Sequence, residues 1–277
     1  MLCIWGKSME KIFVVIVSFN EKNKTLRLLD QLKCQKGKFQ ITTIVVDNHS
    51  EDGFIRAIRK RKYKNNILVP LSRNLGYGRA CNKGIRLALF HNATYLCFLN
   101  SDIKLPNNFF VDMLKNKTDI VGPVIKYKKN KKTIYDLGGM IDWRIGRIKH
   151  QEQIDSKFKA LNNRIKPDYI SGCCVIIKRA VFEKIGLFDE RFFLYFEDAD
   201  LQIRAIKNGF KLILDKKVEV LHELKGVSEN TNKSFTNLFY NLQSNLLFIL
   251  KYQRGKNLIF SLIYYIALVF KVLLNQI

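Results

Sequence analysis

The sequence predicts an α/β protein in which a mostly parallel β-sheet carries helices on both faces. Over the first hundred residues, segments that are apolar throughout alternate with segments of helical periodicity. This alternation is typical of parallel strands that are buried on both faces and joined by helices. At 277 residues, the chain is long enough to bury a large core in one or two domains.

The first half supplies four expected strands and three expected helices. The strands are "KIFVVIVSFN" (11–20), "ITTIVVDNHS" (41–50), "NILVPLS" (66–72) and "ATYLCFLNSD" (93–102). Helical periodicity places the helices between them, at residues 24–35, 53–64 and 78–92.

The second half is less regular. Between residues 123 and 170 we expect short strands or a hairpin, with turns at Gly138-Gly139 and at Gly146. The remaining expected elements are a strand and a helix within 168–190, a helix that starts at Asp198, a strand pair within 211–222 that ends at His222, and an amphipathic helix at 235–255.

The composition is strongly basic. The 48 basic and 24 acidic residues give a formal net charge of +24, which favours anionic partners such as nucleic acid, anionic lipid or phosphorylated substrates. The basic clusters at 56–64 and 126–132 lack the pattern of an RNA-binding sheet or a recognition helix, so we expect no nucleic-acid partner. The six cysteines lack CxxC pairs and framework spacing, which predicts core thiols in a reducing compartment and no zinc.

The two ends of the chain differ in character. Residues 1–10 lack the apolar core of a signal peptide and are expected to form an N-terminal extension. Residues 258–274 are apolar on all sides except at Lys271, and they follow the basic stretch "KYQRGKN". This run is shorter than the ~20 residues of a spanning helix, and its basic flanks suit the interface of an anionic leaflet. We expect a cytoplasmic protein attached peripherally to the inner face of the cell membrane, with a core helix or a dimer helix as the alternatives.

Polar residues gather where the four expected strands end. A single strand that ends in Asp or Asn is ordinary turn chemistry. Four successive strands that end in polar residues at one edge of a parallel sheet indicate a binding site, because such sheets bind ligands beyond the carboxyl ends of their strands. The segments are Ser18-Phe19-Asn20, Asp47-Asn48-His49-Ser50, Ser72-Arg73-Asn74 and Asn100-Ser101-Asp102.

Three acids stand close together after an aromatic stretch. Glu197, Asp198 and Asp200 follow the aromatic residues of 192–196, and like charges and apolar neighbours both oppose ionisation. A helix start accepts acids in its first turn, and Asp200 stands four residues before Arg204, the spacing of a surface ion pair. Asp200 is therefore expected to be structural. Glu197 and Asp198 have no such partner and are candidates for chemistry.

A dinucleotide-binding oxidoreductase is one alternative for such a sheet. Its fingerprint requires G-x-G-x-x-G between the first strand and the first helix. The first turn here, "VSFNEKNK", contains no glycine, and "GYGRAC" (76–81) follows the third strand and lacks the last glycine. This alternative is therefore disfavoured.

Six motifs in order resemble the inverting family 2 glycosyltransferases, which have the GT-A fold. They are "VVIVSFN", "IVVDNHSEDG", "NLGYGRACNKGI", "FLNSDIKLP", "SGCCVIIKRAVFEKIGLFDERFFLYFEDADLQIRA" and "LHELKGVS". Each motif is weak alone, but together the sequence is similar to the rhamnosyltransferase-type members that build bacterial surface polysaccharide. The resemblance implies a catalytic domain at 11–230, with a nucleotide-binding part at 11–122 and an acceptor-binding part at 123–230, followed by C-terminal helices at 231–277.

The resemblance implies a nucleotide-sugar donor site at the polar strand ends. A carboxylate or amide there can pair with the imide edge of uracil or thymine, and Arg79 is expected to meet diphosphate oxygens. Glycines in "NLGYGRACNKG" would let the backbone approach the ligand, with a plain loop into a helix as the alternative. The implied donor-binding residues are Ser18, Asn20, Asp47, Asn48, Asn74, Gly76, Gly78, Arg79, Asn82, Asn100 and Asp102.

The resemblance also implies a divalent metal. "NSD" (100–102) stands where the family carries its Asp-x-Asp motif, so Asp102 would hold Mg²⁺ or Mn²⁺ against the two phosphates. His222 matches the later metal histidine of the family, and imidazole suits Mn²⁺ better than Mg²⁺. Polar surface is the alternative for a lone histidine at a strand end.

Asp198 matches the catalytic acid of the family, within the "ED" pair. In an inverting transfer the acceptor hydroxyl must lose a proton to a carboxylate held beside it, and Asp198 is the expected general base. Glu197 and the neighbouring aromatics are expected to raise its pKa. Glu197, Gly172 and Tyr195 are the expected acceptor-binding residues.

The expected partners follow from the same resemblance. The donor is expected to be dTDP-rhamnose, with UDP-sugars as competitors, and the choice depends on residues 138–170. The acceptor is expected to be a glycan, most simply a lipid-linked one beside an anionic membrane surface. A non-catalytic basic scaffold that binds membranes or nucleic acid on a degenerate transferase domain is the alternative function. The sequence leaves the acceptor, the linkage and the oligomeric state open.

Overall fold

A computed structural model describes residues 9–159, 166–223 and 235–274. Its strands are β1 (Glu10–Ser18), β2 (Phe39–Asp47), β3 (Asn66–Pro70), β4 (Tyr95–Asn100), β5 (Ile103–Lys104), β6 (Ile120–Lys129), β7 (Lys132–Asp142), β8 (Arg147–Ile154), β9 (Cys174–Lys178) and β10 (Leu212–His222). Its helices are α1 (Lys22–Lys33), α2 (Phe54–Arg61), α3 (Tyr77–Phe90), α4 (Phe109–Leu114), α5 (Asp155–Lys159), α6 (Arg179–Ile185), α7 (Glu197–Lys207), α8 (Phe235–Tyr252) and α9 (Gly255–Leu274).

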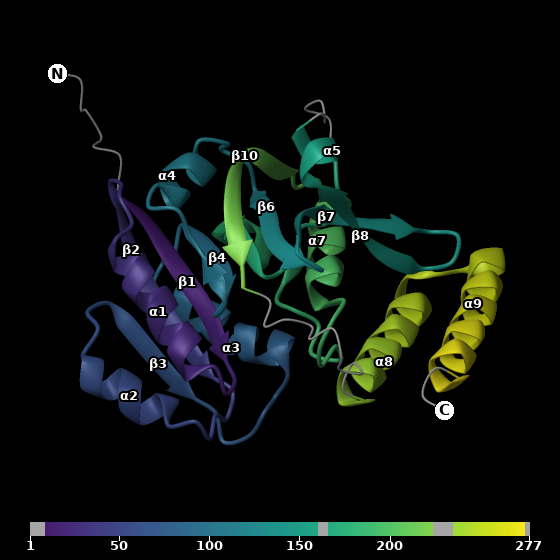
Figure 1. Cartoon of the computed structure of the whole chain (residues 1–277), viewed down its shortest axis with the longest axis horizontal. Coiled ribbons are helices and arrows are strands. Elements are labelled where there is room, and N and C mark those ends of the chain that lie inside the picture. Colours follow the sequence, from purple (N-terminus) through teal and green to yellow (C-terminus); the bar gives the residue numbers. More distant parts are fainter. Residues whose placement is uncertain (1–8, 160–165, 224–234, 275–277) are drawn as a thin grey trace.

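One twisted sheet runs through the molecule (Figure 1). Its strand order is β3-β2-β1-β4-β9-β6-β10-β5, and β7 and β8 extend it beside β6. The pairings give β3, β2, β1, β4, β6 and β10 one direction, and β9 and β5 run the opposite way. The expected α/β class with a mostly parallel sheet is confirmed.

Helices cover both faces of the sheet because its central strand is apolar on both sides. Ile12, Val14 and Ile16 of β1 pack in a cluster with residues of α1, α2 and α4. Phe13 and Val15 pack on the opposite face, in a cluster with residues of α3, α6 and α7. Period-two alternation of the side chains therefore sends successive residues of a single strand into two separate cores.

The turns of the second half differ from the expectation. Gly138 and Gly139 lie inside β7, where the pairing with β8 shifts register between Asp136 and Gly139. The turn between β6 and β7 instead lies at Asn130 and Lys131, both with left-handed backbone. Gly146, with φ of 63°, does lie in the turn between β7 and β8, as expected.

The last expected strand pair is a single strand. β10 runs from Leu212 to His222 beside β6, with an irregular register between Asp215 and Glu219. This irregularity explains why the sequence reads as two short segments, since the apolar alternation breaks there. The expected N-terminal extension and the boundary at 230/231 fall largely on residues 1–8 and 224–234, which lie outside the described residues.

Cysteines 81, 97, 173 and 174 are buried and unpaired, in keeping with core thiols. Cys34 differs from them, because it is exposed.

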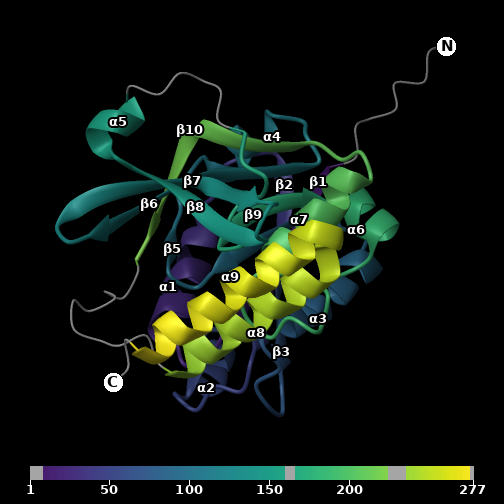
Figure 2. The same ribbon diagram turned by 90° about the vertical axis from the view of Figure 1, so that its right-hand side faces the viewer.

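The two C-terminal helices form an appendage on the side of the sheet away from β3. α8 and α9 lie side by side, with α9 on the outside (Figure 2). By length and composition, α9 could cross a membrane. Only 6% of its most apolar 18-residue stretch is buried in the structure. The core-helix alternative is therefore wrong for this chain.

Candidate functional site

The polar strand ends lie together at one edge of the sheet. Ser18 pairs in register with Asp47 on β2, and Val17 pairs with Asn100 on β4. β10 runs in the same direction as β4, so its last residue, His222, reaches the same edge.

Asp102 and His222 meet because of a short antiparallel pairing. β5 places Ile103 opposite His222, and Nε2 of His222 lies 3.0 Å from Oδ1 of Asp102. Lys24 of α1 approaches the other oxygen of Asp102 at 3.4 Å. Burial alone would raise the pKa of Asp102, but the hydrogen bond and charge of His222 and the charge of Lys24 outweigh it and lower that pKa.

Lys24 belongs to a small polar cluster that the sequence did not reveal. Its Nζ lies 2.6 Å from Oε1 of Glu21, and the hydroxyl of Ser101 donates to the other oxygen of Glu21. Burial lowers the pKa of Lys24, but Glu21 and Asp102 raise it overall, so the ammonium is held as a cation. A positive charge therefore stands beside Asp102 at the edge of the sheet.

The Asp102–His222 pair offers one oxygen and one nitrogen ligand. The described residues contain no group of three or more His, Cys, Asp and Glu side chains that could hold a metal ion. Two protein ligands suffice for an ion that completes its shell with phosphate oxygens and water, and Mn²⁺ accepts both donor types. The pair therefore fits a divalent ion that is shared with a diphosphate ligand.

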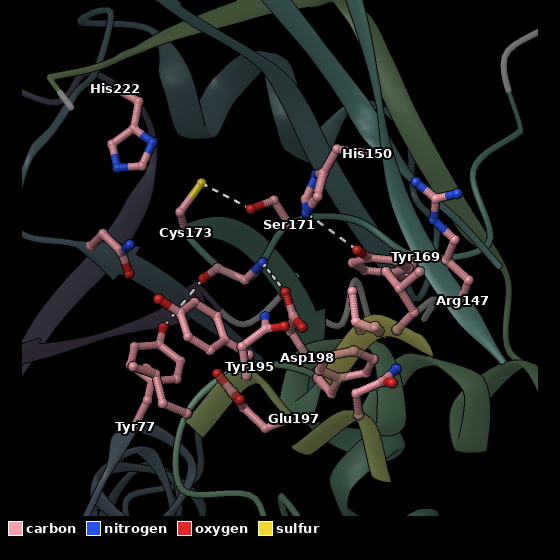
Figure 3. Close-up of a pocket in the computed structure, with 18 of the residues that line it drawn as sticks. Tyr77, Arg147, His150, Tyr169, Ser171, Cys173, Tyr195, Glu197, Asp198 and His222 are labelled. Atoms are coloured by element: carbon pink, nitrogen blue, oxygen red, sulfur yellow. Dashed lines mark hydrogen bonds between the residues drawn. The ribbon is translucent and has the colours of Figure 1, made fainter. Parts of the chain in front are cut away.

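A cavity of about 560 Å³ opens beside this edge. Asn100 and His222 line one side, Glu197 and Asp198 lie in its wall, and residues of α8 and α9 close another side. Figure 3 shows the carboxylate of Asp198 pointing toward the backbone of the 171–173 segment, between His222 and Arg147.

Asp198 is held by the backbone around it. The amide N–H of Gly172 donates to Oδ2 at 2.8 Å, and the N–H of Ala199 donates to Oδ1 at 2.8 Å. A Cβ on Gly172 would lie 2.9 Å from Cβ of Asp198, so this close approach requires glycine. Tyr77 fixes the same segment, because its hydroxyl donates to the carbonyl of Gly172 at 3.2 Å.

The chain enters α7 through two strained residues. Tyr195 and Phe196 have φ values of 70° and 67°, a left-handed conformation that bulky residues rarely adopt and that is common at functional sites. These two residues precede Glu197 and Asp198, and Tyr195 itself lines the cavity with them. All three predicted acceptor-binding residues, including Gly172, therefore line one cavity with Asp198.

Glu197 and Asp198 form a coupled acidic pair. Glu197 is 5% exposed, and its Oε2 has no hydrogen-bond partner among the described residues. Burial, and then the charge of Asp198, raises the pKa of Glu197 to about 8. Burial also raises the pKa of Asp198, although the N–H of Gly172 and the charge of His150 oppose it. Glu197 therefore holds its proton near neutral pH, and a neutral neighbour opposes ionisation of Asp198 less than a charged one would.

Asp200 is structural, as expected, but its ion pair is buried rather than on the surface. Nε of Arg204 donates to its carboxylate at 2.9 Å, and the side chain of Asp200 is fully buried. Lys251 and Tyr252 of α8 bind its other oxygen, the tyrosine hydroxyl at 2.7 Å. Lys251 also lies 2.7 Å from Asp189. Asp200 therefore holds α8 against α7.

Four predicted donor-binding residues form the polar lining of the sheet edge. Ser18 shares a hydrogen bond of 2.9 Å with the hydroxyl of Thr25, and Oδ1 of Asn20 accepts from the N–H of Glu51. Oδ2 of Asp47 accepts from a backbone N–H, whereas its buried Oδ1 has no partner among the described residues. The side chain of Asn48 contacts that of Asn74.

The Asn48–Asn74 contact shapes the loop before α3. Nδ2 of Asn48 donates to Oδ1 of Asn74 at 2.8 Å, and the N–H of Gly76 donates to the same oxygen at 2.9 Å. The absence of a side chain at Gly76 makes room for another part of the protein. A Cβ on Gly76 would lie 2.3 Å from the carbonyl of Phe193, and Gly78 packs on Phe188 and Glu197.

Arg79 and Asn82 contact other parts of the protein, and their donor-binding role stays a prediction. Nε of Arg79 donates to the carbonyl of Glu190 at 2.8 Å, on an exposed part of α3. Asn82 is buried and exchanges two hydrogen bonds of 3.0 Å with the backbone of Phe188. Neither residue lines the cavity. Their helix faces the 188–190 segment, which sequence spacing alone could not show.

Several cavity residues were not predicted from the sequence. Arg147 and His150 come from β8, where the sequence pattern is weak, and the walls from α8 and α9 depend on contacts between distant segments. The structure marks His150 as unusual because its pKa is raised. Burial lowers this pKa, but the carboxylate of Asp136, 2.8 Å away, raises it by more. The other lining residues that were not predicted as site residues include Tyr77, Tyr169, Ser171, Cys173, Asn241, Asn245, Tyr264 and Leu268.

Comparison with known proteins identifies the family of the chain. The family model for "Glycosyl transferase family 2" matches residues 13–186. The chain is 26% identical to an N-acetylglucosaminyl-diphospho-decaprenol L-rhamnosyltransferase of Mycobacterium tuberculosis, over 76% of this chain and 75% of the relative. It is 25% identical to the dTDP-rhamnosyl transferase RfbF of Shigella flexneri, over 77% of this chain and 69% of the relative.

Solved structures share the fold. The mannosyltransferase PcManGT from Pyrobaculum calidifontis, solved in complex with GDP-Man and Mn²⁺, superposes with a TM-score of 0.56 at 18% identity. The match covers 88% of this chain but 64% of that one, which is less than two thirds of its length. At this identity the likeness concerns the fold alone.

Proposed function

The chain belongs to glycosyl transferase family 2, in its rhamnosyltransferase-like branch, and from this premise we propose that it transfers rhamnose with inversion from dTDP-rhamnose to a lipid-linked glycan. UDP-sugars are the competing donors. The observation that carries the proposal is the position of Asp198 and His222 in the wall of one cavity, with Asp102 bound to His222.

Asp198 acts as the general base. The acceptor oxygen attacks the anomeric carbon, its proton passes to the Asp198 carboxylate, and the bond between that carbon and the diphosphate oxygen breaks. The N–H groups of Gly172 and Ala199 hold the carboxylate in place, so little reorganisation is needed during the reaction. Glu197 retains a proton beside it, which removes one negative charge that would otherwise oppose ionisation of Asp198.

The donor diphosphate lies at the edge of the sheet, near Asp102 and His222. These two residues would hold the divalent ion, which when bound offsets charge on the leaving diphosphate. Lys24 adds a fixed positive charge at the same place. The buried Oδ1 of Asp47, which has no partner among the described residues, would accept a hydrogen bond from the base or ribose. Ser18 is fully buried beside it on β1.

The C-terminal helices attach the enzyme to the inner face of the cell membrane. The outward side chains of α9 are apolar and 53–70% exposed. A helix on the surface of a soluble protein normally has polar side chains on its outward face. Residues 231–277 contain five Lys and Arg residues and no Asp or Glu, which favours an anionic leaflet. The exposed apolar positions are Ile259, Phe260, Ile263, Ile266, Phe270, Leu273 and Leu274.

Donor screening tests the proposal. The full chain is incubated with Mn²⁺, a lipid-diphosphate-linked N-acetylglucosamine, and dTDP-rhamnose, UDP-glucose or GDP-mannose in turn, and products are weighed by mass spectrometry. We expect a rhamnosylated product from dTDP-rhamnose. Failure of dTDP, UDP and GDP to shift the melting temperature, together with no product, would instead support the non-catalytic scaffold, which the comparisons do not favour.

A further inference from the structure

Arg147 is a charged residue of the cavity wall that the proposed chemistry does not use. It is the first residue of β8 and lines the cavity with Asp198. Its charge helps to lower the pKa of Asp142, which lies opposite it on β7, but its guanidinium makes no hydrogen bond or ion pair with any residue that the structure describes. In the view of Figure 3, Arg147 lies on the opposite side of Asp198 from His222. It is therefore separated from the proposed metal and donor diphosphate.

The C-terminal helices hold Arg147 in this position. The preceding Gly146 packs so tightly that a Cβ would lie 2.9 Å from Ile249 of α8. Trp143, at the start of the same turn, packs against Phe248, with ring centroids 6.2 Å apart. The carbonyl of Trp143 also accepts a hydrogen bond from Asn257 of α9. The turn that carries Arg147 is thus fixed to the α8–α9 junction.

The cavity wall beside α8 and α9 combines apolar and polar groups. Tyr264 and Leu268 of α9 line the cavity, while the outward face of the same helix is apolar and exposed. Asn245 of α8 lines the same cavity, is 4% exposed, and its Oδ1 has no partner among the described residues. A ligand here would find a cation, a hydrogen-bond acceptor without a partner among the described residues, and the side chains of Tyr264 and Leu268 from α9.

We propose that this wall is the subsite for the carrier end of the acceptor, with Arg147 binding a phosphate that joins the acceptor sugar to an apolar chain. Arginine suits phosphate because its planar fork donates two hydrogen bonds at once. Asn245 accepts a hydrogen bond from a sugar hydroxyl, and Tyr264 and Leu268 contact the first part of the chain. The inference rests on the proposed sugar transfer, since it names the acceptor class of that site.

Binding of two matched probes tests this subsite without requiring turnover. The first probe is N-acetylglucosamine joined through a diphosphate to a geranyl chain, and the second is geranyl N-acetylglucosaminide, which lacks phosphate. Calorimetry on the full chain should show tighter binding of the first probe. Arg147→Gln should weaken it about 10- to 100-fold, the range for a hydrogen bond to a charged group, and leave the second unchanged. Arg147→Lys should recover part of the loss.

Arg144→Gln is the matched control. Arg144 lies in the same turn, is 85% exposed in its side chain, and pairs with Asp142 outside the cavity. The Arg144→Gln variant removes the same charge as Arg147→Gln and should leave the affinity for both probes unchanged. Equal affinity of the wild-type chain for both probes would overturn the proposal, as would equal weakening by the two variants.

A bilayer headgroup is the other source of phosphate. If Arg147→Gln lowered binding to phosphatidylglycerol vesicles more than Arg144→Gln did, and left the first probe unaffected, the proposal would also be overturned. Because these measurements need no nucleotide sugar, a chain that binds the first probe through Arg147 but transfers no sugar would contradict the proposed function alone.

Discussion

The imidazole of His222 lies 3.0 Å from the carboxylate of Asp102, at the shared edge of β10 and β5. We predict that this pair carries the metal-dependent part of donor binding. Asp102→Ala should abolish the extra melting-temperature shift that Mn²⁺ adds to dTDP, and His222→Ala should reduce it. Identical dTDP affinity of the wild-type chain with Mn²⁺ and with EDTA would remove the metal role.

Lys251 is predicted to stabilise the attachment of α8 strongly. It joins the fully buried carboxylate of Asp200 to the partly buried carboxylate of Asp189. Arg204 and Arg191 still pair with these acids, so removal of Lys251 leaves part of the buried charge uncompensated. Lys251→Met should lower the free energy of unfolding by about 3 kcal/mol, measured by urea denaturation.

Lys115→Met is the control for that measurement. Lys115 pairs with Asp112, but both side chains are exposed, at 70% and 40%. Such a pair contributes about 0–1 kcal/mol, so its loss should be small. Equal destabilisation by the two variants would show that Asp200 does not fasten α8.

Glu197 should make stability fall as pH rises. Its pKa is raised from an ordinary 4.5 to about 8 in the folded chain. Between these values the folded state holds a proton that the unfolded state has released, so raising the pH favours unfolding. The melting temperature of Glu197→Gln should therefore decline less than that of the wild-type chain between pH 5 and pH 8.5. Parallel curves would show that Glu197 is ionised in the folded state.

The apolar face of α9 should determine membrane attachment. Ile263→Lys combined with Phe270→Lys places two charges on that face, where both residues are about 60% exposed. The variant should move from the membrane pellet to the supernatant, because charge opposes burial in the interface. Phe90→Lys, at an exposed apolar position on α3, should leave the distribution unchanged. A wild-type chain that is already in the supernatant would contradict the attachment.

The fold was largely predictable because each buried parallel strand has a local signature. β1 and β4 each have an apolar run that ends at a polar last residue. The ends of these strands, and hence the positions of Ser18 and Asn100, are therefore predictable from the sequence alone. Asp102 and His222 were predicted separately through resemblance. Only the antiparallel pairing of β5 with β10 shows that they touch.

The rest of the site depends on contacts that leave no local signal. Gly76 was expected to approach a ligand, but its missing side chain makes room for Phe193. A glycine in the sequence indicates a close approach to the backbone, but it does not show whether a ligand or another part of the protein makes that approach. Arg147 and Asn245 come from the start of β8 and from α8, which are far apart in the sequence but line one cavity. Residue spacing cannot reveal such a meeting.

The central claim is that Asp198 removes the acceptor proton during sugar transfer, and the most direct test is the turnover of Asp198→Asn. The variant keeps the size of the side chain and the donor site is separate, so dTDP affinity by calorimetry should match that of the wild-type chain. The rate of product formation from dTDP-rhamnose should fall by at least about 100-fold, the contribution expected of a general base. A variant that binds dTDP normally and retains most of the wild-type rate would contradict the account.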